Sequence, residues 1–400
     1  MFSFLNNSDE EVAFLIDVGN GTVTGAVVVY KKEQKPKFIF VVKKYFSTSE
    51  ILESKKLSSD MSSLFEETLV LLTTKGFEHR YWKNKSKKVS KIMISFSSPW
   101  FLSKTKNIHI TNDKEFSITE AFLHDILNNE VTILKNELKS GEGSEDYEVV
   151  EKSIVHSKIN GYVLDDSIGK TTKTFDASLY LSVVGKEFLN KIHDSVHKIT
   201  HLGEKHIIVN TFPLVVFTVT RDHFSISPDF VLMDITSEIT DLTLVKDDII
   251  EKTVSFPSGK NFIVRQISKA LNVSAEIAES TLKLFVAKKL DENMLSKVSE
   301  IMSSIEKEWS IYFESALLEL SPEVNLPSSV FITSDFDTAD IYTDFLRLQK
   351  LDATSVFRKN LKITHLDLDK MNSFYENESG FSLDEFIVLI SLFYKKVIAK

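Results

Sequence analysis

Residues 14–29 read FLIDVGNGTVTGAVVV, an apolar strand, a short polar turn and a second apolar strand. Asp17 stands near the end of the first strand, and Gly19 and Gly21 lie in the turn. Glycine carries no Cβ, so a turn of this kind can bring backbone N–H groups close to a phosphate. An ordinary β-hairpin has the same pattern, and the stretch alone does not separate the two interpretations.

The same pattern returns in the second half of the chain. Residues 230–245 read FVLMDITSEITDLTLV, in which Asp234 ends the strand as Asp17 does. An internal repeat sets the architecture, and two similar halves predict two lobes with a cleft between them. Chance similarity between two hairpins is the alternative.

Composition excludes several classes of function. The 400 residues contain no cysteine, which excludes disulfides, thiolate metal sites and thiol catalysis. A net charge of −9 argues against broad nucleic-acid binding. No apolar run approaches the ~20 residues that span a bilayer, and the first residues lack the basic flank of a signal peptide. We therefore expect a cytoplasmic protein of two or more lobes, with no transmembrane segment.

Between the repeats, the pattern predicts a compact inserted subdomain at 105–204. Its expected order is β-α-β-β-β-α: a strand at 107–110, a helix from Ser117, strands at 147–156, 158–164 and 174–184, and a helix at 186–201. The last helix carries His193, His197 and His201 along one side. We interpret them as facing solvent, with a shared metal site as the alternative.

Periodicity also predicts elements in the two lobes. Helices are expected at 58–76, 262–271, 274–284, 295–320 and 383–398, and strands at 38–45, 92–96, 206–210, 249–256 and 330–333. The helix at 383–398 is apolar on most sides, so we expect it to be buried. The basic run at 83–88 is interpreted as a solvated loop, with an acidic-lipid or phosphate patch as the alternative.

Two further motifs lie in the second half. Residues 257–263 read PSGKNFI, and residues 275–279 read AEIAE. They stand where the actin-like ATPase superfamily has a Pro-x-Gly-Gly-Asn-x-Ile turn and an Ala-Glu-x-x-Lys helix. With the two aspartate strands, this order resembles the branch of the division protein FtsA and the type IV pilus protein PilM. The insertion resembles the SHS2 module of that branch, and residues 1–5 are similar to PilM-type N-termini.

The resemblance implies an α/β, actin-like (ribonuclease H-like) fold with two lobes. It would contain two duplicated mixed-sheet domains and the inserted β-α-β-β-β-α subdomain. The implied domains are the first lobe at 10–104, the SHS2-like insertion at 105–204, the return of the first lobe at 205–228, the second lobe at 229–374, and a C-terminal helix at 375–400 that packs back on the first lobe.

The resemblance also implies a nucleotide site, with Mg·ATP as the cofactor. Nucleotide-binding residues, where the site is retained, would be Asp17, Gly19, Asn20, Gly21, Thr22, Thr240, Asp241, Gly259, Lys260 and Asn261. The carboxylates that would hold Mg²⁺ through water are Asp17, Asp234 and Asp241. Capping the ends of buried strands is the alternative role of these aspartates. No catalytic residue is predicted.

Departures from the motifs weaken this site. In the first turn, Thr24 stands where the family has a lysine, and in the turn at 257–263 Lys260 stands where it has a glycine. In the second turn, Thr236, Ser237 and Glu238 stand at three glycine positions and Ile239 at a threonine position. Residues 334–337 stand where the family has a Gly-Gly turn. Side chains at glycine positions keep amides away from phosphates. Glu238 and Asp335 add negative charge, which repels a polyanion and which Lys260 would partly offset.

Motifs and departures together predict a scaffold or adaptor of the PilM/FtsA type, a pseudo-ATPase in a pilus or division assembly. Its expected partner is the cytoplasmic tail of an inner-membrane protein, which would hold it at the inner face of the membrane; self-association into dimers or filaments is a further option. The alternative is a Mg·ATP-binding switch whose nucleotide state controls assembly. A sugar or acetate kinase is less favoured, because the sequence shows no phosphate-clamping arginine cluster.

Overall fold

The computed structural model describes residues 10–46, 54–83, 85, 87–139, 146–164, 167–224, 227–320, 326–334, 338–348 and 361–398. The side chains of 54–56 and 163 are outside this description. The predictions for residues 1–5 and for the turn at 335–337 therefore lie outside the described residues.

Two sheets repeat one arrangement of strands, as the sequence repeat predicts. Their orders are β15-β3-β2-β1-β4-β9 and β12-β11-β10-β13-β14. In each sheet the strand with the aspartate pairs antiparallel with the next strand and parallel with a later one. The first sheet contains β1 (Glu10–Val18), β2 (Thr22–Lys31), β3 (Lys37–Tyr45), β4 (Lys91–Phe96), β9 (Ile207–Thr211) and β15 (Glu376–Asn377). The second contains β10 (Phe230–Ile235), β11 (Thr240–Lys246), β12 (Ile249–Phe256), β13 (Ser329–Ser334) and β14 (Lys362–His365).

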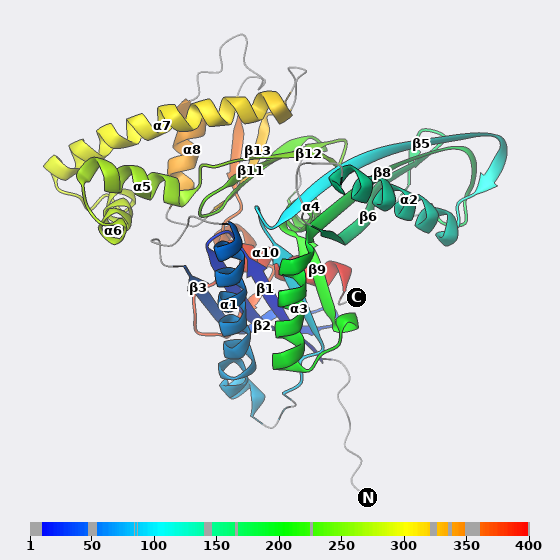
Figure 1. Cartoon of the computed structure of the whole chain (residues 1–400), viewed down its shortest axis with the longest axis horizontal. Coiled ribbons are helices and arrows are strands. Elements are labelled where there is room, and N and C mark those ends of the chain that lie inside the picture. Colours follow the sequence, from blue (N-terminus) through cyan, green and yellow to red (C-terminus); the bar gives the residue numbers. More distant parts are fainter. Residues whose placement is uncertain are drawn as a thin grey trace, which may run out of the picture.

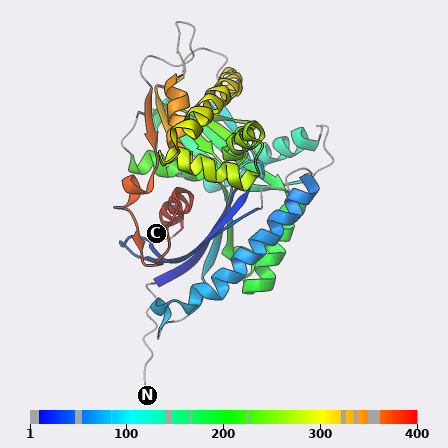
Figure 2. The same cartoon turned by 90° about the vertical axis from the view of Figure 1, so that its left-hand side faces the viewer.

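Helices cover both faces of the first sheet. Helices α1 (Ser54–Thr73) and α3 (Lys186–Thr200) lie on one face, and α4 (Phe212–His223) and α10 (Glu385–Val397) lie on the other (Figures 1 and 2). A strand covered on both faces can be apolar along its whole length. This explains why every residue from Val12 to Val18 is buried.

Helices α4 and α10 sit between the two lobes. Their side chains form one core cluster with residues of both sheets, including Leu15 of β1, Phe217 of α4, Phe230 of β10 and Leu389 of α10. All residues of α10 from Glu385 to Tyr394 are buried. The C-terminal helix is therefore a buried core element, as predicted, and no described helix is both long and apolar enough to cross a membrane.

Four helices complete the second lobe around Trp309, which is fully buried. They are α5 (Lys260–Leu271), α6 (Ala275–Val286), α7 (Glu292–Leu320) and α8 (Ala339–Leu348). The first three were predicted to within a few residues, and Ser274 Oγ accepts a hydrogen bond from the Ile277 amide as the N-cap of α6. Helix α8 was missed, although its buried positions at 341, 342, 345 and 346 have helical spacing. A short helix, α9 (Leu368–Met371), precedes β15.

The insertion projects from the body as a four-stranded sheet in the order β5-β8-β6-β7, with α2 on one face (Figure 1). Its elements are β5 (Phe101–Ser117), α2 (Glu120–Lys139), β6 (Tyr147–Ile159), β7 (Tyr162–Val163) and β8 (Thr171–Gly185). Two predictions were wrong in extent. The strand expected at 107–110 is 17 residues long, and the one expected at 158–164 is 2 residues long. Strand β5 is mostly polar because helix α2 covers only one face of this sheet.

Helix α3 packs on α1 and the first sheet. Phe188, Ile192 and Val196 belong to the same core as Phe14 and Phe65. The boundary at 204 stays a prediction, and this packing favours an earlier end for the insertion, near residue 185. On α3, His197 and the C-cap His201 are exposed as expected, and His193 is half-buried. The lysines at 83, 85, 87 and 88 are exposed, as a solvated loop requires.

Gly25 of β2 sets the distance between the first sheet and α1. A Cβ at this position would lie 2.6 Å from Thr68 Cγ2 and 3.0 Å from Leu72 Cδ1. Gly25→Ala is therefore expected to lower the free energy of unfolding by about 1–3 kcal/mol, measured by urea denaturation. Gly203→Ala is the matched control, because a Cβ there meets nothing within 4 Å. Equal, small effects of the two substitutions would contradict this packing.

Candidate functional site

The turn after β1 and the turn after β10 meet where the predicted nucleotide site lies. A Cβ built on Gly21 would be 3.2 Å from both Cβ and Oγ of Ser237. The cavity left between the turns has a volume of only about 20 Å³; its lining residues are Asp17, Gly19, Thr22, Lys43, Ser97, Ile235, Thr236, Ser237 and Phe386. Pockets for ligands of nucleotide size are on the order of 300–1,000 Å³. The cleft is shut in this structure.

The chain itself holds the first turn in place. The Gly19 amide donates to Thr22 O at 3.0 Å, and Trp100 Nε1 donates to Gly19 O at 2.7 Å. The Phe46 amide donates to Gly21 O at 3.0 Å. Asn20, in the same turn, is 4% exposed. The predicted phosphate turn is thus a tight hairpin connection in which the Gly19 amide and the carbonyls of Gly19 and Gly21 are bonded to the fold.

The second turn occupies the start of α5. The amides of Gly259, Lys260 and Asn261 donate to the carbonyls of Glu238 (3.1 Å), Thr236 (3.1 Å) and Ser237 (2.7 Å). The first amides of a helix have no partner within the helix and commonly hold anions. Here, main-chain carbonyls of the second turn fill that position.

Gly259 allows this contact. A Cβ at Gly259 would lie 2.3 Å from Thr236 O and 2.7 Å from the Glu238 nitrogen. Thr240, predicted as a nucleotide ligand, lies in the same region and is fully buried. Its Oγ1 donates to Ser258 O at 2.7 Å. Gly259 and Thr240 therefore serve the junction of turn, strand and helix.

Two charged departures from the motif are matched by partners within the lobe. Glu238 accepts hydrogen bonds from Arg265 Nη1 at 2.7 Å and from Asn261 Nδ2 at 2.8 Å. Lys260 Nζ lies 3.3 Å from Glu279 Oε1. Lys260 stands at the second glycine of the Pro-x-Gly-Gly-Asn-x-Ile turn, and Glu279 stands at the lysine of the Ala-Glu-x-x-Lys helix. The two replacements therefore form an ion pair with each other. Lys260 was expected to offset Glu238, whereas Arg265 does so.

Arg265 and Glu279 were missed in the sequence. Arg265 follows Asn261 by one helical turn, so the spacing places both on one face of α5. Glu279 replaces the lysine of the Ala-Glu-x-x-Lys pattern, and a change of sign there was the available signal.

At the position of the family's phosphate lysine, Thr24 ties the hairpin to α10. Thr24 Oγ1 donates to Asp384 Oδ2 at 3.1 Å, and Lys43 Nζ lies 3.1 Å from the same oxygen. The other oxygen of Asp384 accepts from the Ile387 amide at 2.9 Å and caps α10. A carboxylate at a helix N-terminus is favourable. The first turn is thereby fixed to the C-terminal helix.

The predicted metal-binding carboxylates are all buried. Asp17 is 4%, Asp234 5% and Asp241 2% exposed. Asp234 and Asp241 face each other across the β10–β11 ladder. Asp234 Oδ1 accepts from Thr333 Oγ1 and Asp241 Oδ1 from Ser255 Oγ, each at 2.6 Å.

Burial and mutual repulsion favour protonated forms of this pair. Burial raises the pKa of Asp241 to about 6. Burial, and then the neighbouring Asp241, raise the pKa of Asp234 well above its usual range, and Asp17 adds to the shift. The charged form of a buried carboxyl is disfavoured, and more so beside a second carboxyl.

A direct metal site is not formed in the part of the chain that the structure describes. It contains no group of three or more His, Cys, Asp or Glu side chains spaced to hold an ion. Asp234 Oδ2 and Asp241 Oδ2 accept no hydrogen bond from a described residue. Magnesium held through water by Asp17, Asp234 and Asp241 therefore stays a prediction.

The fold of this chain is similar to that of solved actin-like structures. A structure described as the PilM–PilN type IV pilus biogenesis complex matches 96% of this chain and 98% of its own, with a TM-score of 0.58 and 10% identity. The chain has an actin-like fold. No protein-family model matches it, and no curated protein matches it by sequence.

Two other actin-like neighbours align over most of the chain. A protein with an actin-like ATPase fold from Bacteroides thetaiotaomicron covers 98% of both chains, with a TM-score of 0.43 and 11% identity. The ethanolamine utilization protein EutJ from Carboxydothermus hydrogenoformans covers 96% of this chain and 89% of its own, with a TM-score of 0.46 and 12% identity. At these identities the likeness concerns the fold alone.

The predicted nucleotide-binding residues stay a prediction, and the cavity that some of them line is small in this structure. The cavity of about 20 Å³ is far below nucleotide size. Gly259, Lys260 and Asn261, which were predicted to bind the nucleotide where the site is retained, donate their amides to the second turn. The structure does bring Asp17, Gly19 and Thr22 to the cavity, with Thr236 and Ser237 opposite.

Asp241 makes stability depend on pH. Its pKa rises from 3.8 to about 6 on folding, so the folded protein keeps a proton that the unfolded chain has lost. The free energy of unfolding should therefore fall as the pH rises through this window and stay lower above it. In the wild type, the contribution of Asp241 should lower the free energy of unfolding by about 2–3 kcal/mol between pH 4 and pH 7, measured by urea denaturation. The Asp241→Asn variant should lack this contribution.

Asp344→Asn on the surface of α8 is the control for this experiment, because the Asp344 side chain is 67% exposed. The control should keep the pH dependence of the wild type. The same dependence in Asp241→Asn would show that Asp241 is not the group responsible.

Proposed function

We propose that this chain is an actin-like scaffold or adaptor that works through protein–protein contacts and has lost the hydrolysis of ATP. The closed cleft carries the proposal: the turns that should cradle phosphates touch each other and leave about 20 Å³. The main-chain amides of Gly19, Gly259, Lys260 and Asn261 are bound to the chain's own carbonyls.

Binding of phosphate at the start of α5 would have a cost in free energy. A phosphate could reach these amides only by displacing their hydrogen bonds to the second turn, each worth about 1 kcal/mol. It would also bring its charge close to Glu238, whose carboxylate is 2.7 Å from Arg265. The ion pair of Lys260 with Glu279 holds the lysine away from any phosphate. These contacts, all within the second lobe, make this side of the cleft a poor site for a polyanion.

The partner we propose is the cytoplasmic tail of an inner-membrane protein. The PilM neighbour was solved as a complex with PilN, and its fold matches this chain at a TM-score of 0.58. By analogy we place this chain in the PilM/FtsA branch, with the insertion as its SHS2-like module and the protein held at the inner face of the membrane. A role in a pilus and a role in division are both consistent with this proposal.

A Mg·ATP-dependent switch is the second candidate. The presence of Asp17, Asp234 and Asp241 favours it, since these are the residues that would hold Mg²⁺ through water; Asp17 lines the cavity between the turns. This candidate requires a second, open conformation in which the two turns separate.

Calorimetric titration with Mg·ATP distinguishes the two candidates. The scaffold should show no heat of binding up to millimolar ATP, because the cleft has no room for the nucleotide. Micromolar binding that is lost in Asp17→Ala and kept in Asp344→Ala would overturn the proposal and establish the switch. The exposed Asp344 controls for loss of a carboxylate elsewhere.

A further inference from the structure

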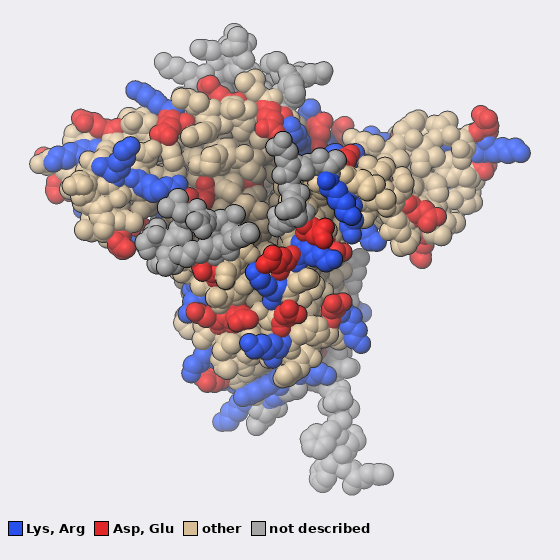
Figure 3. Space-filling view, in the orientation of Figure 1, with Lys and Arg blue, Asp and Glu red and all other residues tan. Residues whose placement is uncertain are grey.

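Lysines gather at the end of the first sheet that lies away from the cleft. Glu10 of β1 pairs with Lys31 of β2, and Lys91 begins the neighbouring strand β4, so all three stand at this end. Strand β1 runs from here to the first turn, which places the two ends of the sheet about 25 Å apart. Figure 3 shows Lys and Arg side chains in blue along the lower end of the first lobe.

The segment at 83–88 is held at this surface by a buried residue on each side. Trp82 is 3% exposed, and its Nε1 donates to Gly76 O at 2.8 Å. Val89 is buried as well. Between these anchors, the described side chains are all exposed lysines, at 83, 85, 87 and 88. Those at 83, 87 and 88 form no ion pair with a described residue, so their charges face solvent together.

Glu10 is shared by two lysines of this end. Lys31 Nζ lies 2.8 Å and Lys85 Nζ 3.3 Å from Glu10 Oε1. Tyr81 donates its hydroxyl to Glu10 Oε2 at 3.2 Å, and Lys85 Nζ lies 3.7 Å from the centroid of the Tyr81 ring. These contacts fix the segment at 83–88 to β1 and β2. One carboxylate serves two ammonium groups here, so the cluster keeps a net positive charge.

Two neighbouring segments add to the positive charge. The turn between β2 and β3 reads KKEQK at 31–35, and its side chains at 32–35 are exposed. On the other side, Lys198 in the last turn of α3 and Lys205 just before β9 are exposed, with Glu204 between them. Strand β9 runs parallel to β4, so it begins at the same end of the sheet. The exposed lysines at 32, 35, 83, 85, 87 and 88 are called the basic end below.

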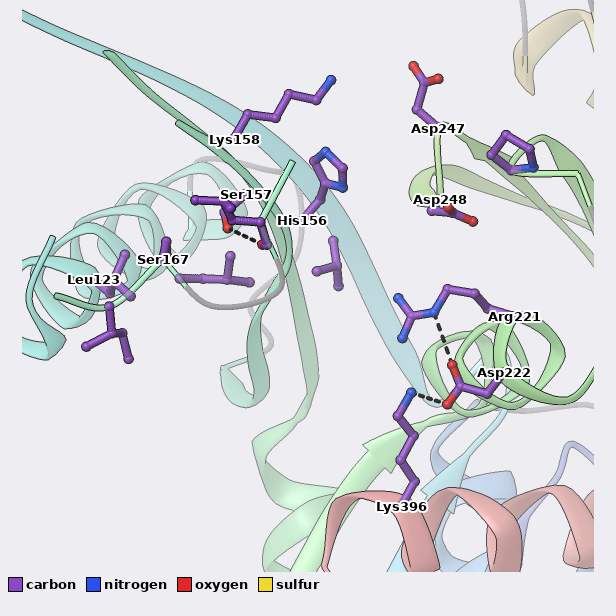
Figure 4. Close-up of a pocket in the computed structure, with 15 residues that line it drawn as sticks. Leu123, His156, Ser157, Lys158, Ser167, Arg221, Asp222, Asp247, Asp248 and Lys396 are labelled. Atoms are coloured by element: carbon purple, nitrogen blue, oxygen red, sulfur yellow. Dashed lines mark hydrogen bonds and ion pairs between the residues drawn. The ribbon is translucent and has the colours of Figure 1, made fainter. Parts of the chain in front are cut away.

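Cations also occur beside the groove of about 770 Å³ between the insertion and the body of the protein. There, Arg221 Nε lies 3.3 Å from Asp222 Oδ1, and Lys396 Nζ is bonded to the other oxygen of Asp222 (Figure 4). Asp247 and Asp248 also line this groove. Carboxylates therefore offset the cations of the groove, whereas the basic end carries an excess of positive charge.

We propose that the basic end binds the surface of an anionic lipid membrane. The whole chain has a net charge of −9, so this end has the sign opposite to that of the protein. Such an asymmetry turns the basic end toward an anionic surface and the rest of the molecule away from it. Lysines close to an anionic leaflet are attracted by its surface potential.

The chemistry of the basic end favours lipid over nucleic acid. Its cations are lysines, whereas bidentate contacts with nucleic-acid phosphates favour arginine. An electrostatic contact of this kind is weak by itself, so it would orient a protein that a second contact also holds at the membrane. The inference goes beyond the proposed function, because this contact needs neither a partner protein nor ATP.

Co-sedimentation of the full-length chain with lipid vesicles tests the proposal. Vesicles of phosphatidylcholine with about 30 mol% phosphatidylglycerol should bind the protein, and vesicles of phosphatidylcholine alone should not, because only the former are anionic. Binding should fall at least tenfold when NaCl rises from about 0.1 M to about 1 M, since the screening length falls from about 10 Å to about 3 Å.

Charge reversal locates the contact. The triple variant Lys83→Glu, Lys87→Glu and Lys88→Glu should bind anionic vesicles at least tenfold more weakly than the wild type. The double variant Lys32→Glu with Lys35→Glu changes a separate turn of the basic end and should also weaken binding.

The triple variant Lys289→Glu, Lys297→Glu and Lys307→Glu is the matched control. It changes three exposed lysines of the second lobe and alters the net charge by the same amount. Its binding to anionic vesicles should stay within about twofold of the wild type, because these lysines would face away from the membrane.

Fluorescence quenching tests the orientation. The chain contains no cysteine, so Gln34→Cys and Ser296→Cys each create a single site for a dye. Both positions are exposed, the first in the turn between β2 and β3 and the second on α7. A nitroxide on the lipid headgroup should quench the dye at 34 and leave the dye at 296 unchanged.

Three results would overturn the inference: no binding to anionic vesicles, equal binding by the triple variant at 83–88 and its control, or stronger quenching at 296 than at 34. Binding of oligothymidylate without binding of vesicles would also overturn it, because the basic end would then serve nucleic acid. The vesicles contain no protein, so failure of these tests would reject the lipid contact alone. Titration with Mg·ATP tests the scaffold proposal separately.

Discussion

The first amides of α5 need hydrogen-bond acceptors, and much of the site follows from which acceptors they have. A helix N-terminus whose amides are buried must be satisfied by a side chain, water, a ligand or another part of the chain. In this protein the carbonyls of Thr236, Ser237 and Glu238 satisfy them. The carbonyls of the second turn thus take the place that an anion commonly has at a helix N-terminus. Gly259 remains necessary, because a Cβ would lie 2.3 Å from Thr236 O.

The two lobes share a core, and this keeps the turns together. Helices α4 and α10 pack between the sheets with side chains from both. Asp384 joins the N-terminus of α10 to Thr24 and Lys43 of the first lobe. Separating the lobes would expose apolar surface of this core to water, which costs about 25 cal/mol of free energy per Å² exposed. A shut cleft and a buried C-terminal helix are thus two consequences of one packing arrangement.

Local sequence patterns predicted the parts of the fold that depend on neighbours in the chain. The hairpins at Asp17 and Asp234 follow from apolar runs and short polar turns, and the start of α6 follows from its capping residue Ser274. Contacts between distant residues were out of reach. The bond from Asn261 to Glu238 and the pair of Lys260 with Glu279 depend on how a turn and two helices meet. Strand β5 was underestimated because helix α2 covers only one face of its sheet and the strand is mostly polar.

Hydrogen exchange at the start of α5 tests most directly whether its amides are available to a phosphate. The backbone amides of Gly259, Lys260 and Asn261 should exchange slowly in the protein alone, because the second turn accepts their hydrogen bonds. Saturating Mg·ATP should leave their exchange rates unchanged. Fast exchange without nucleotide and strong protection after addition of Mg·ATP would contradict this account, because it would show that these amides are available to bind phosphate.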